Sequence, residues 1–178
     1  YKKFSKAFTK KLNFFKPQLS NSELIIKDGI FNISSTEGKG LTSKHDSDTT
    51  KGYVYIAGGT FNISNCTEGI EGTAIVIEGG DIDVTANDDG LNAASETTTD
   101  TATTETTETA QMPGGDQTPG GGGMMASDPN AYISIAGGTI RLNATGDGID
   151  SNGNIDINGG LVYISLVGDG GNCALDYG

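Results

Sequence analysis

The sequence contains no tryptophan, few aromatic residues and no long apolar run. Only 7% of its 178 residues are aromatic and 34% are hydrophobic, which is little material for a layered globular core. We therefore expect one elongated domain. No run of about 20 apolar residues is present, so we predict no transmembrane segment. The opening residues lack the apolar centre of a signal peptide, and the chain begins at Tyr1, so we expect a fragment or a mature product.

Basic residues are scarce and unevenly placed. The chain has 11 Lys and Arg against 23 Asp and Glu, a net charge of −12, and residues 1–19 hold six of the basic residues and none of the acidic ones. The remaining chain is therefore strongly acidic and repels phosphate backbones, so we expect no nucleic-acid partner. Divalent cations are the natural counter-charge. Zinc is disfavoured, because His45 is the only histidine and the two cysteines lie far apart in the sequence.

Glycine is abundant, with 28 residues, and it marks an internal repeat. Four Gly-Gly pairs each stand between two short segments of alternating apolar residues, and the period is 21 or 22 residues where no insertion intervenes. A weaker fifth copy starts near Glu23, with Asp28 and Gly29 in place of the pair. The four pairs occupy positions 58/59, 79/80, 137/138 and 159/160.

Alternating apolar residues flank each glycine pair. In one copy Val54 and Ile56 precede the pair, and Phe61 and Ile63 follow it. This period of two is typical of strands with one buried face, so each coil is predicted to run strand, turn, strand, turn. One such coil cannot bury its apolar face, but stacked coils bury a continuous column. The sequence predicts an all-β, single-stranded parallel β-helix over residues 20–178. A glycine-rich linker is the alternative, but a linker would not place apolar β-branched residues at the same positions of every copy.

Three segments fall outside the repeat. Residues 1–19 are basic, and their apolar residues recur at helical spacing up to Pro17, so an amphipathic helix is predicted there. It would cap the open end of the solenoid or bind an anionic membrane surface. A short insertion is expected around Thr42 to Lys51. A long insertion at about 95–130 is rich in Thr and Glu, then in Gly, Pro and Met. It is predicted to be a disordered loop, or a glycosylated spacer.

Acidic residues recur at one turn of the repeat. Ten residues after the second glycine of each pair comes another glycine, preceded by an acidic residue and followed by Asp, Glu or Asn two residues later. Equivalent positions on stacked coils lie about 4.8 Å apart, so two columns of oxygen-bearing side chains are expected. The first column is Glu68, Asp89, Asp147 and Asp169, and the second is Glu71, Asn92, Asp150 and Asn172, with Asp88 alongside.

Carboxylates stacked at this spacing repel one another, at a cost on the order of 1 to 3 kcal/mol per pair. Ca²⁺ would neutralise them, because it takes about six to eight oxygen ligands in flexible geometry. The sequence therefore favours calcium as cofactor, with Glu68, Glu71, Asp88, Asp89, Asn92, Asp147, Asp150 and Asp169 as candidate ligands. Ordinary turn formation by Asp and Asn is the alternative. Cys66 and Cys173 are expected about three coils apart, too far for a disulfide, so both are predicted to be free thiols.

Several motifs resemble one bacterial family in matched order. They are ThrPheAsnIleSer from Thr60, AspGlyLeuAsnAla from Asp89, GlyAspGlyIleAspSerAsnGly from Gly146 and AlaLeuAspTyrGly from Ala174. Residues 23–178 resemble carbohydrate-binding domain-containing proteins with a polysaccharide-lyase-like β-helix. This resemblance implies a right-handed helix, bound calcium, export to the cell surface or medium, and binding of cellulose and acidic plant polysaccharides. Seven of the calcium candidates match positions of that family, all but Asp169. Family members continue into further coils beyond the position of Gly178.

The strand phase places four tyrosines outside the core, where aromatic rings can stack on sugar rings. They are Tyr53, Tyr55, Tyr132 and Tyr163, and Tyr53 and Tyr132 share a column two coils apart, about 10 Å. These residues favour a binding module for plant cell-wall polysaccharides over an enzyme. A polysaccharide lyase would need a base beside the metal; Lys39 is the best candidate, although its column suggests charge balance, and Arg141 points outward elsewhere. A structural adhesin that uses calcium for rigidity is the third alternative. Oligomeric state is left open.

Overall fold

A computed structural model describes residues 23–45, 48–95, 127–168 and 171–178. Within these residues the chain forms 15 strands and no helix, so no helix there is long and apolar enough to cross a bilayer. The basic segment 1–19, most of the long insertion and Asp169 lie outside the described residues.

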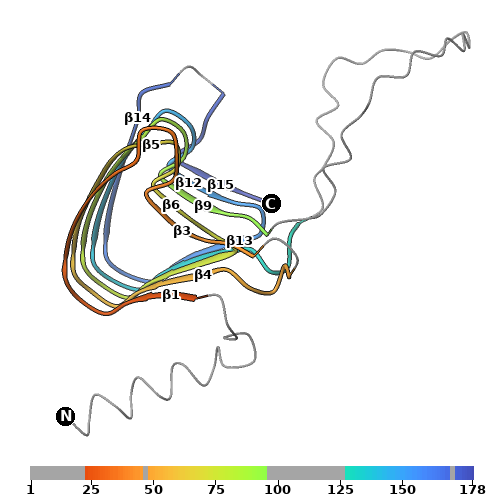
Figure 1. Cartoon of the computed structure of the whole chain (residues 1–178). Helices are drawn as coiled ribbons and strands as arrows, with labels where there is room; N and C mark the ends of the chain where they lie inside the picture. Colours follow the sequence, from red (N-terminus) through yellow and green to blue (C-terminus); the bar gives the residue numbers. More distant parts are fainter. Residues whose placement is uncertain (1–22, 46–47, 96–126, 169–170) are drawn as a thin grey trace, which may run out of the picture.

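The strands form three parallel sheets, each with one strand from every coil. The coils stack behind one another when the molecule is viewed nearly end-on (Figure 1). The first sheet contains β1 (Glu23–Ile26), β4 (Tyr53–Ile56), β7 (Ala74–Ile77), β10 (Tyr132–Ile135) and β13 (Asn154–Ile157). The second contains β2 (Ile30–Ser34), β5 (Thr60–Cys66), β8 (Asp81–Ala86), β11 (Thr139–Ala144) and β14 (Leu161–Leu166). The third contains β3 (Leu41–Ser43), β6 (Ile70–Gly72), β9 (Leu91–Ala93), β12 (Ile149–Ser151) and β15 (Leu175–Tyr177).

This arrangement confirms the parallel β-helix, with one correction. Each coil has three strands, not the two predicted, because the turn expected after the second strand leads directly into a three-residue strand. Three residues are too short for a period of two to stand out in the sequence. The residues Thr42 and Ser43, expected to begin an insertion, instead pair with Glu71 and Gly72. The right-handed sense of the helix stays a prediction.

The core is the predicted column of inward-facing side chains. Val54, Ile75 and Ile133 lie in register on consecutive coils, and each is 0% exposed. At the corner between the first two sheets, the second glycine of each pair has a positive φ, for example 112° at Gly59 and 110° at Gly80. Only glycine adopts this conformation without strain, which explains why the second glycine of the pair recurs.

A second glycine column begins the third sheet. A Cβ atom on Gly69 would lie 2.4 Å from the carbonyl oxygen of Gly90, and one on Gly90 would lie 2.6 Å from that of Gly148. The coils therefore approach too closely for a side chain at this position. This contact fixes the height at which the neighbouring acidic residues stack.

Both insertions leave the solenoid at one corner, between the third sheet and the first. The short one follows β3 and the long one follows β9. Asp128 accepts hydrogen bonds from the backbone and hydroxyl of Ser95, so the two ends of the long insertion are held together. The coils before and after it remain paired, with Ala74 opposite Tyr132. The insertions therefore do not interrupt the stacking.

Candidate functional site

The predicted acidic columns exist along the start of the third sheet. Backbone hydrogen bonds of 2.9 Å from Gly69 to Asp89 and from Gly90 to Asp147 place Glu68, Asp89 and Asp147 at one position of successive coils. Lys39 takes this position in the first coil. Three residues further along each coil, Glu71, Asn92 and Asp150 are in direct register within the third sheet. We call these two columns the acidic ladder.

In the last coil the sequence alignment is wrong. The backbone nitrogen of Gly148 bonds to the carbonyl of Cys173, so Cys173 takes the ladder position expected for Asp169. Asp176, which was not predicted, pairs with Asp150 in place of Asn172. Asn172 instead donates to the backbone carbonyl of Thr145 at 2.7 Å. The reason is a longer turn between β14 and β15, which shifts the last strand relative to the ten-residue spacing of the other coils.

At one end of the ladder, which we call the lysine-paired end, lysines neutralise the acids. The Nζ atom of Lys39 lies 2.5 Å from Glu68 and 3.3 Å from Glu71, and that of Lys44 lies 2.6 Å from Glu71. Glu68 and Glu71 are only 7% and 5% exposed. Burial raises the pKa of Glu68. Burial acts in the same direction on Glu71, but Lys44 and Lys39 outweigh it and lower the pKa of Glu71.

Lys39 therefore has the charge-balancing role that its column suggested. Burial favours a lower pKa for this lysine, but the hydrogen bond to Glu68 and the charge of Glu71 outweigh it and raise the pKa of Lys39. A protonated, paired lysine is a poor general base. Arg141 lies on β11 of the second sheet and pairs with Asp81.

At the other end, which we call the acidic end, carboxylates gather without a cation. One oxygen from each of Asp147, Asp150 and Asp176 lies within 4.8 Å of the others. Among the described residues, no lysine or arginine forms an ion pair with them. Burial, then the charges of Asp147 and Asp176, raises the pKa of Asp150 to about 6. Asp147 Oδ1 also accepts the backbone N–H of Cys173 at 2.5 Å.

Asp89 and Asn92 extend the acidic end toward the previous coil. Asp89 is 9% exposed, and burial together with the charges of Asp88, Asp150 and Asp147 raises its pKa to about 6, although its Oδ1 accepts the backbone N–H of Asp147 at 2.7 Å. The amide nitrogen of Asn92 donates to Asp89 at 3.3 Å, while its Oδ1 is buried with no hydrogen-bond partner among the described residues. An unsatisfied amide oxygen beside clustered carboxylates is the donor set that a hard cation prefers.

Asp88 lies at the edge of this group. A Cβ atom on Gly146, in the next coil, would be 2.5 Å from Asp88 Oδ1 and 2.4 Å from Asp89 Oδ1. Both carboxylates therefore rest against a backbone position that only glycine leaves open. The structure thus brings together five of the predicted ligands, Asp88, Asp89, Asn92, Asp147 and Asp150, and adds Asp176. It pairs the neighbouring Glu68 and Glu71 with lysines.

The four tyrosines differ in exposure, and one prediction fails. Tyr53 is 4% exposed, so it is not on the open surface. Its ring centroid lies 6.3 Å from that of Tyr132, closer than the expected 10 Å, because small Ala74 stands between them in the column and lets the rings lean together. Tyr55 and Tyr132 are half-buried, and Tyr163 is 57% exposed. Of the four, Tyr163 offers the most open aromatic face.

Both cysteines are free thiols, as predicted. Cys66 is buried at the end of β5, and burial raises its pKa. Cys173 is exposed.

A family model and a solved structure match this chain. No curated protein matches the sequence. A solved structure titled as the polysaccharide lyase-like protein from C. thermocellum, gadolinium derivative, is 22% identical, with a TM-score of 0.44. The match covers 84% of this chain and 50% of that chain, so this chain spans about half the length of that protein. A family model described as carbohydrate-binding domain-containing protein matches residues 19–170. The chain therefore belongs to the carbohydrate-binding domain-containing family.

Proposed function

We propose that this chain is a calcium-dependent binding module for plant cell-wall polysaccharides, namely cellulose, acidic pectic sugars or both, at the outside of a bacterial cell. The observation that carries the calcium part is the acidic end of the ladder, where Asp147, Asp150 and Asp176 converge and no lysine or arginine of the described part of the chain pairs with them. The family supports the carbohydrate part. The sugars named here are therefore proposed, not shown, for this chain and for any longer protein that contains it.

The residues of the acidic end suit Ca²⁺ better than a transition metal. They offer carboxylate oxygens and the free amide oxygen of Asn92, and no histidine or thiolate belongs to the cluster. Asp89, Asn92, Asp147, Asp150 and Asp176 would hold the ion. A bound Ca²⁺ would supply positive charge to which a uronate carboxylate can bind. Asp176 is exposed, so the site faces solvent on one side.

A polysaccharide lyase is the competing function, and the positions of the basic residues disfavour it. Lys39 contacts Glu68 and Glu71 at the lysine-paired end, and Arg141 lies on a different sheet. Neither is placed beside the acidic end. A structural adhesin is the other alternative. Affinity for a sugar would distinguish a binding module from it.

The test is retention of the whole chain on cross-linked polygalacturonate with calcium and with chelator. We expect retention with calcium and loss with chelator. Asp150→Asn combined with Asp176→Asn should abolish retention, whereas Asp156→Asn, an exposed acid on β13, should not. A folded wild-type chain that passes through the matrix in both conditions refutes the acidic-sugar function, and equal retention with chelator refutes the calcium dependence.

A further inference from the structure

The outer face of the second sheet carries a polar surface that the acidic ladder does not use. Along β8 and β11 the residues alternate between exposed and buried, so every second side chain points to solvent. One outward column runs through Asn62, Asp83, Arg141 and Tyr163 in direct register. Beside it run Thr85, Asn143 and Ser165. Amide, hydroxyl, carboxylate and guanidinium groups thus stand next to one exposed ring.

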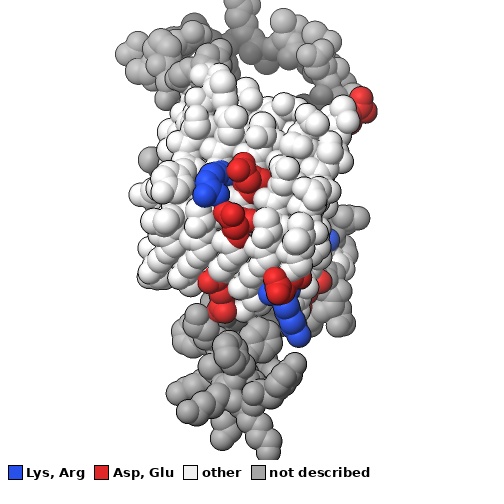
Figure 2. All heavy atoms as spheres, turned by 90° about the vertical axis from the view of Figure 1, so that its left-hand side faces the viewer, with Lys and Arg blue, Asp and Glu red and all other residues white. Residues whose placement is uncertain are grey.

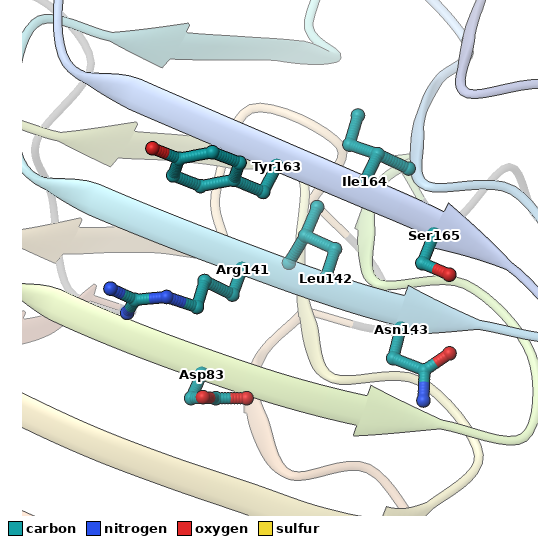
Figure 3. Close-up of a pocket in the computed structure, with 7 residues that line it drawn as sticks. All are labelled: Asp83, Arg141, Leu142, Asn143, Tyr163, Ile164 and Ser165. Carbon is teal, nitrogen blue, oxygen red and sulfur yellow. The ribbon is translucent and has the colours of Figure 1, made fainter.

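This surface is hollowed over β8, β11 and β14. The hollow measures about 540 Å³, and Asp83, Arg141, Asn143, Tyr163 and Ser165 line it (Figure 3). The Arg141 and Tyr163 side chains extend in the same direction along their strands, while Asn143 and Ser165 stand further along (Figure 3). The hollow therefore has an aromatic and guanidinium end and a hydroxyl and amide end.

The one basic group that lines this hollow is already paired within the protein. Arg141 Nη1 lies 2.7 Å from Asp81 Oδ1, and both side chains are about half exposed. Asp83 adds a second carboxylate, so Asp81, Asp83 and Arg141 together carry one negative charge. Most of this face is uncharged, with a basic group beside acidic ones (Figure 2). An acidic polymer would have to compete with Asp81 for the guanidinium, whereas neutral hydroxyl groups can bond to both ions as they stand.

The spacing of the face suits a sugar chain. Successive coils lie about 4.8 Å apart, a distance comparable to the length of one pyranose residue. The exposed ring of Tyr163 can pack against the C–H face of a pyranose, and its neighbours can exchange hydrogen bonds with ring hydroxyls. Leu142 and Ile164 complete the lining, so apolar and aromatic side chains stand beside a few polar groups, as is typical of small-ligand sites.

We infer that this hollow binds a neutral, extended polysaccharide, and that it does so without calcium. The inference rests on the proposed function and divides it: the acidic end of the ladder takes acidic sugars through calcium, and the hollow takes neutral ones. Arg141 and Tyr163 belong to the second sheet, while Asp150 and Asp176 belong to the third. Removal of calcium therefore leaves the residues of the hollow in place.

The experiment measures retention of the whole chain on insoluble cellulose, with calcium and with chelator. We expect equal retention in both conditions. Tyr163→Ala should weaken binding about tenfold, and Arg141→Ala should also weaken it. Both residues are on the surface, so the variants should fold, which circular dichroism checks. Tyr177→Ala is the matched control, because Tyr177 is an exposed tyrosine, 72% exposed, on the third sheet.

The outcomes separate this inference from the proposed function. If the wild-type chain binds polygalacturonate with calcium but not cellulose, the hollow has no such ligand, and the calcium function stands. If cellulose retention requires calcium, or if Tyr177→Ala weakens it as much as Tyr163→Ala, the assignment to the hollow is wrong. If cellulose is retained with chelator and polygalacturonate never is, the hollow is supported, and the calcium function fails.

Discussion

The two ends of the acidic ladder share a backbone and differ in how their charge is met. At the lysine-paired end, Lys39 and Lys44 contact Glu68 and Glu71 directly. At the acidic end, Asp147, Asp150 and Asp176 each place an oxygen within 4.8 Å of the others, with no such partner among the described residues. The repeat therefore determines where the side-chain oxygen atoms lie. Sequence differences between its copies determine whether lysines of the same chain neutralise those oxygens or leave their negative charge available to a metal ion.

The largest effect should come from making the lysine-paired end resemble the acidic end. Lys39→Met combined with Lys44→Met leaves Glu68 and Glu71 buried without a cation. Breaking a buried ion pair is strongly destabilising, and we expect a loss of about 3 kcal/mol after allowance for the partial exposure of both lysines. Urea unfolding in the presence of chelator measures it. If the ladder geometry alone creates a calcium site, added calcium should recover part of the lost stability. If it recovers none, Ca²⁺ cannot replace the positive charges of Lys39 and Lys44 at this end.

A second variant disturbs the backbone that both ends share. Gly90→Ala places a Cβ atom 2.6 Å from the carbonyl oxygen of Gly148 and 3.2 Å from Leu142. Because backbone atoms cannot move aside cheaply, we expect a loss of about 2 to 3 kcal/mol. Thermal unfolding measures it. Gly171→Ala is the matched control, since a Cβ there meets nothing within 4 Å, and equal losses in both variants would contradict the steric explanation.

Calcium should stabilise the folded chain through the acidic end and not through the lysine-paired end. A ligand that binds only the folded chain adds about 2 kcal/mol when its free concentration is roughly 30 times Kd. We expect calcium to raise the melting temperature of the wild-type chain, and Asp150→Asn with Asp176→Asn to remove that increase. Asp156→Asn should keep it. If calcium raises the melting temperature of the double variant as much as that of the wild-type chain, the ion binds elsewhere.

The smallest effect is a difference in pH dependence between the two ends. Without calcium, Asp89 and Asp150 have pKa values raised from 3.8 to about 6. A raised pKa gives stability that is present below the unfolded value and lost as the pH rises through the folded one. The calcium-free chain should therefore lose on the order of 1 kcal/mol between pH 4 and pH 7.

At the lysine-paired end, the raised pKa of Glu68 acts with the same sign as the raised values at the acidic end, and Glu71 should act in a different window. The lowered pKa of Glu71 gives stability that is lost only as the pH falls below the ordinary glutamate value of 4.5. Melting temperatures from pH 3.5 to pH 7.5 in chelator separate the two windows. A chain that gains stability steadily from pH 4 to pH 7 would contradict the raised values at the acidic end.

The sequence predicted the fold well, because a two-residue period and a fixed glycine spacing are local signals. It predicted the ladder in the middle coils for the same reason: Asp89 and Asp147 each precede a glycine ten residues after a pair. Asp176 was missed because a longer turn precedes it, although Ala174, Leu175 and Asp176 repeat the small, apolar, acidic order of Gly148, Ile149 and Asp150. That order was the available signal.

Exposure was harder to predict than register. The outward phase of Tyr53 was correct, but its burial depends on what covers it. Tyr132, two coils away in the sheet and 79 positions later in the chain, leans over Ala74 toward it. The pairing of Glu71 with Lys44 similarly depends on a lysine that comes after β3, outside the repeat pattern. Side-chain contacts between coils are not periodic, so the repeat does not reveal them.

The corner at which both insertions leave the solenoid has a consequence for protein engineering. Ser95 and Asp128 hold the two ends of the long insertion close together, and the strands on either side stay in register. Closely spaced ends at a surface are the condition under which a guest domain can be spliced into a host. A fluorescent reporter grafted between these two residues would mark the module while leaving both its termini and its stacked coils unaltered.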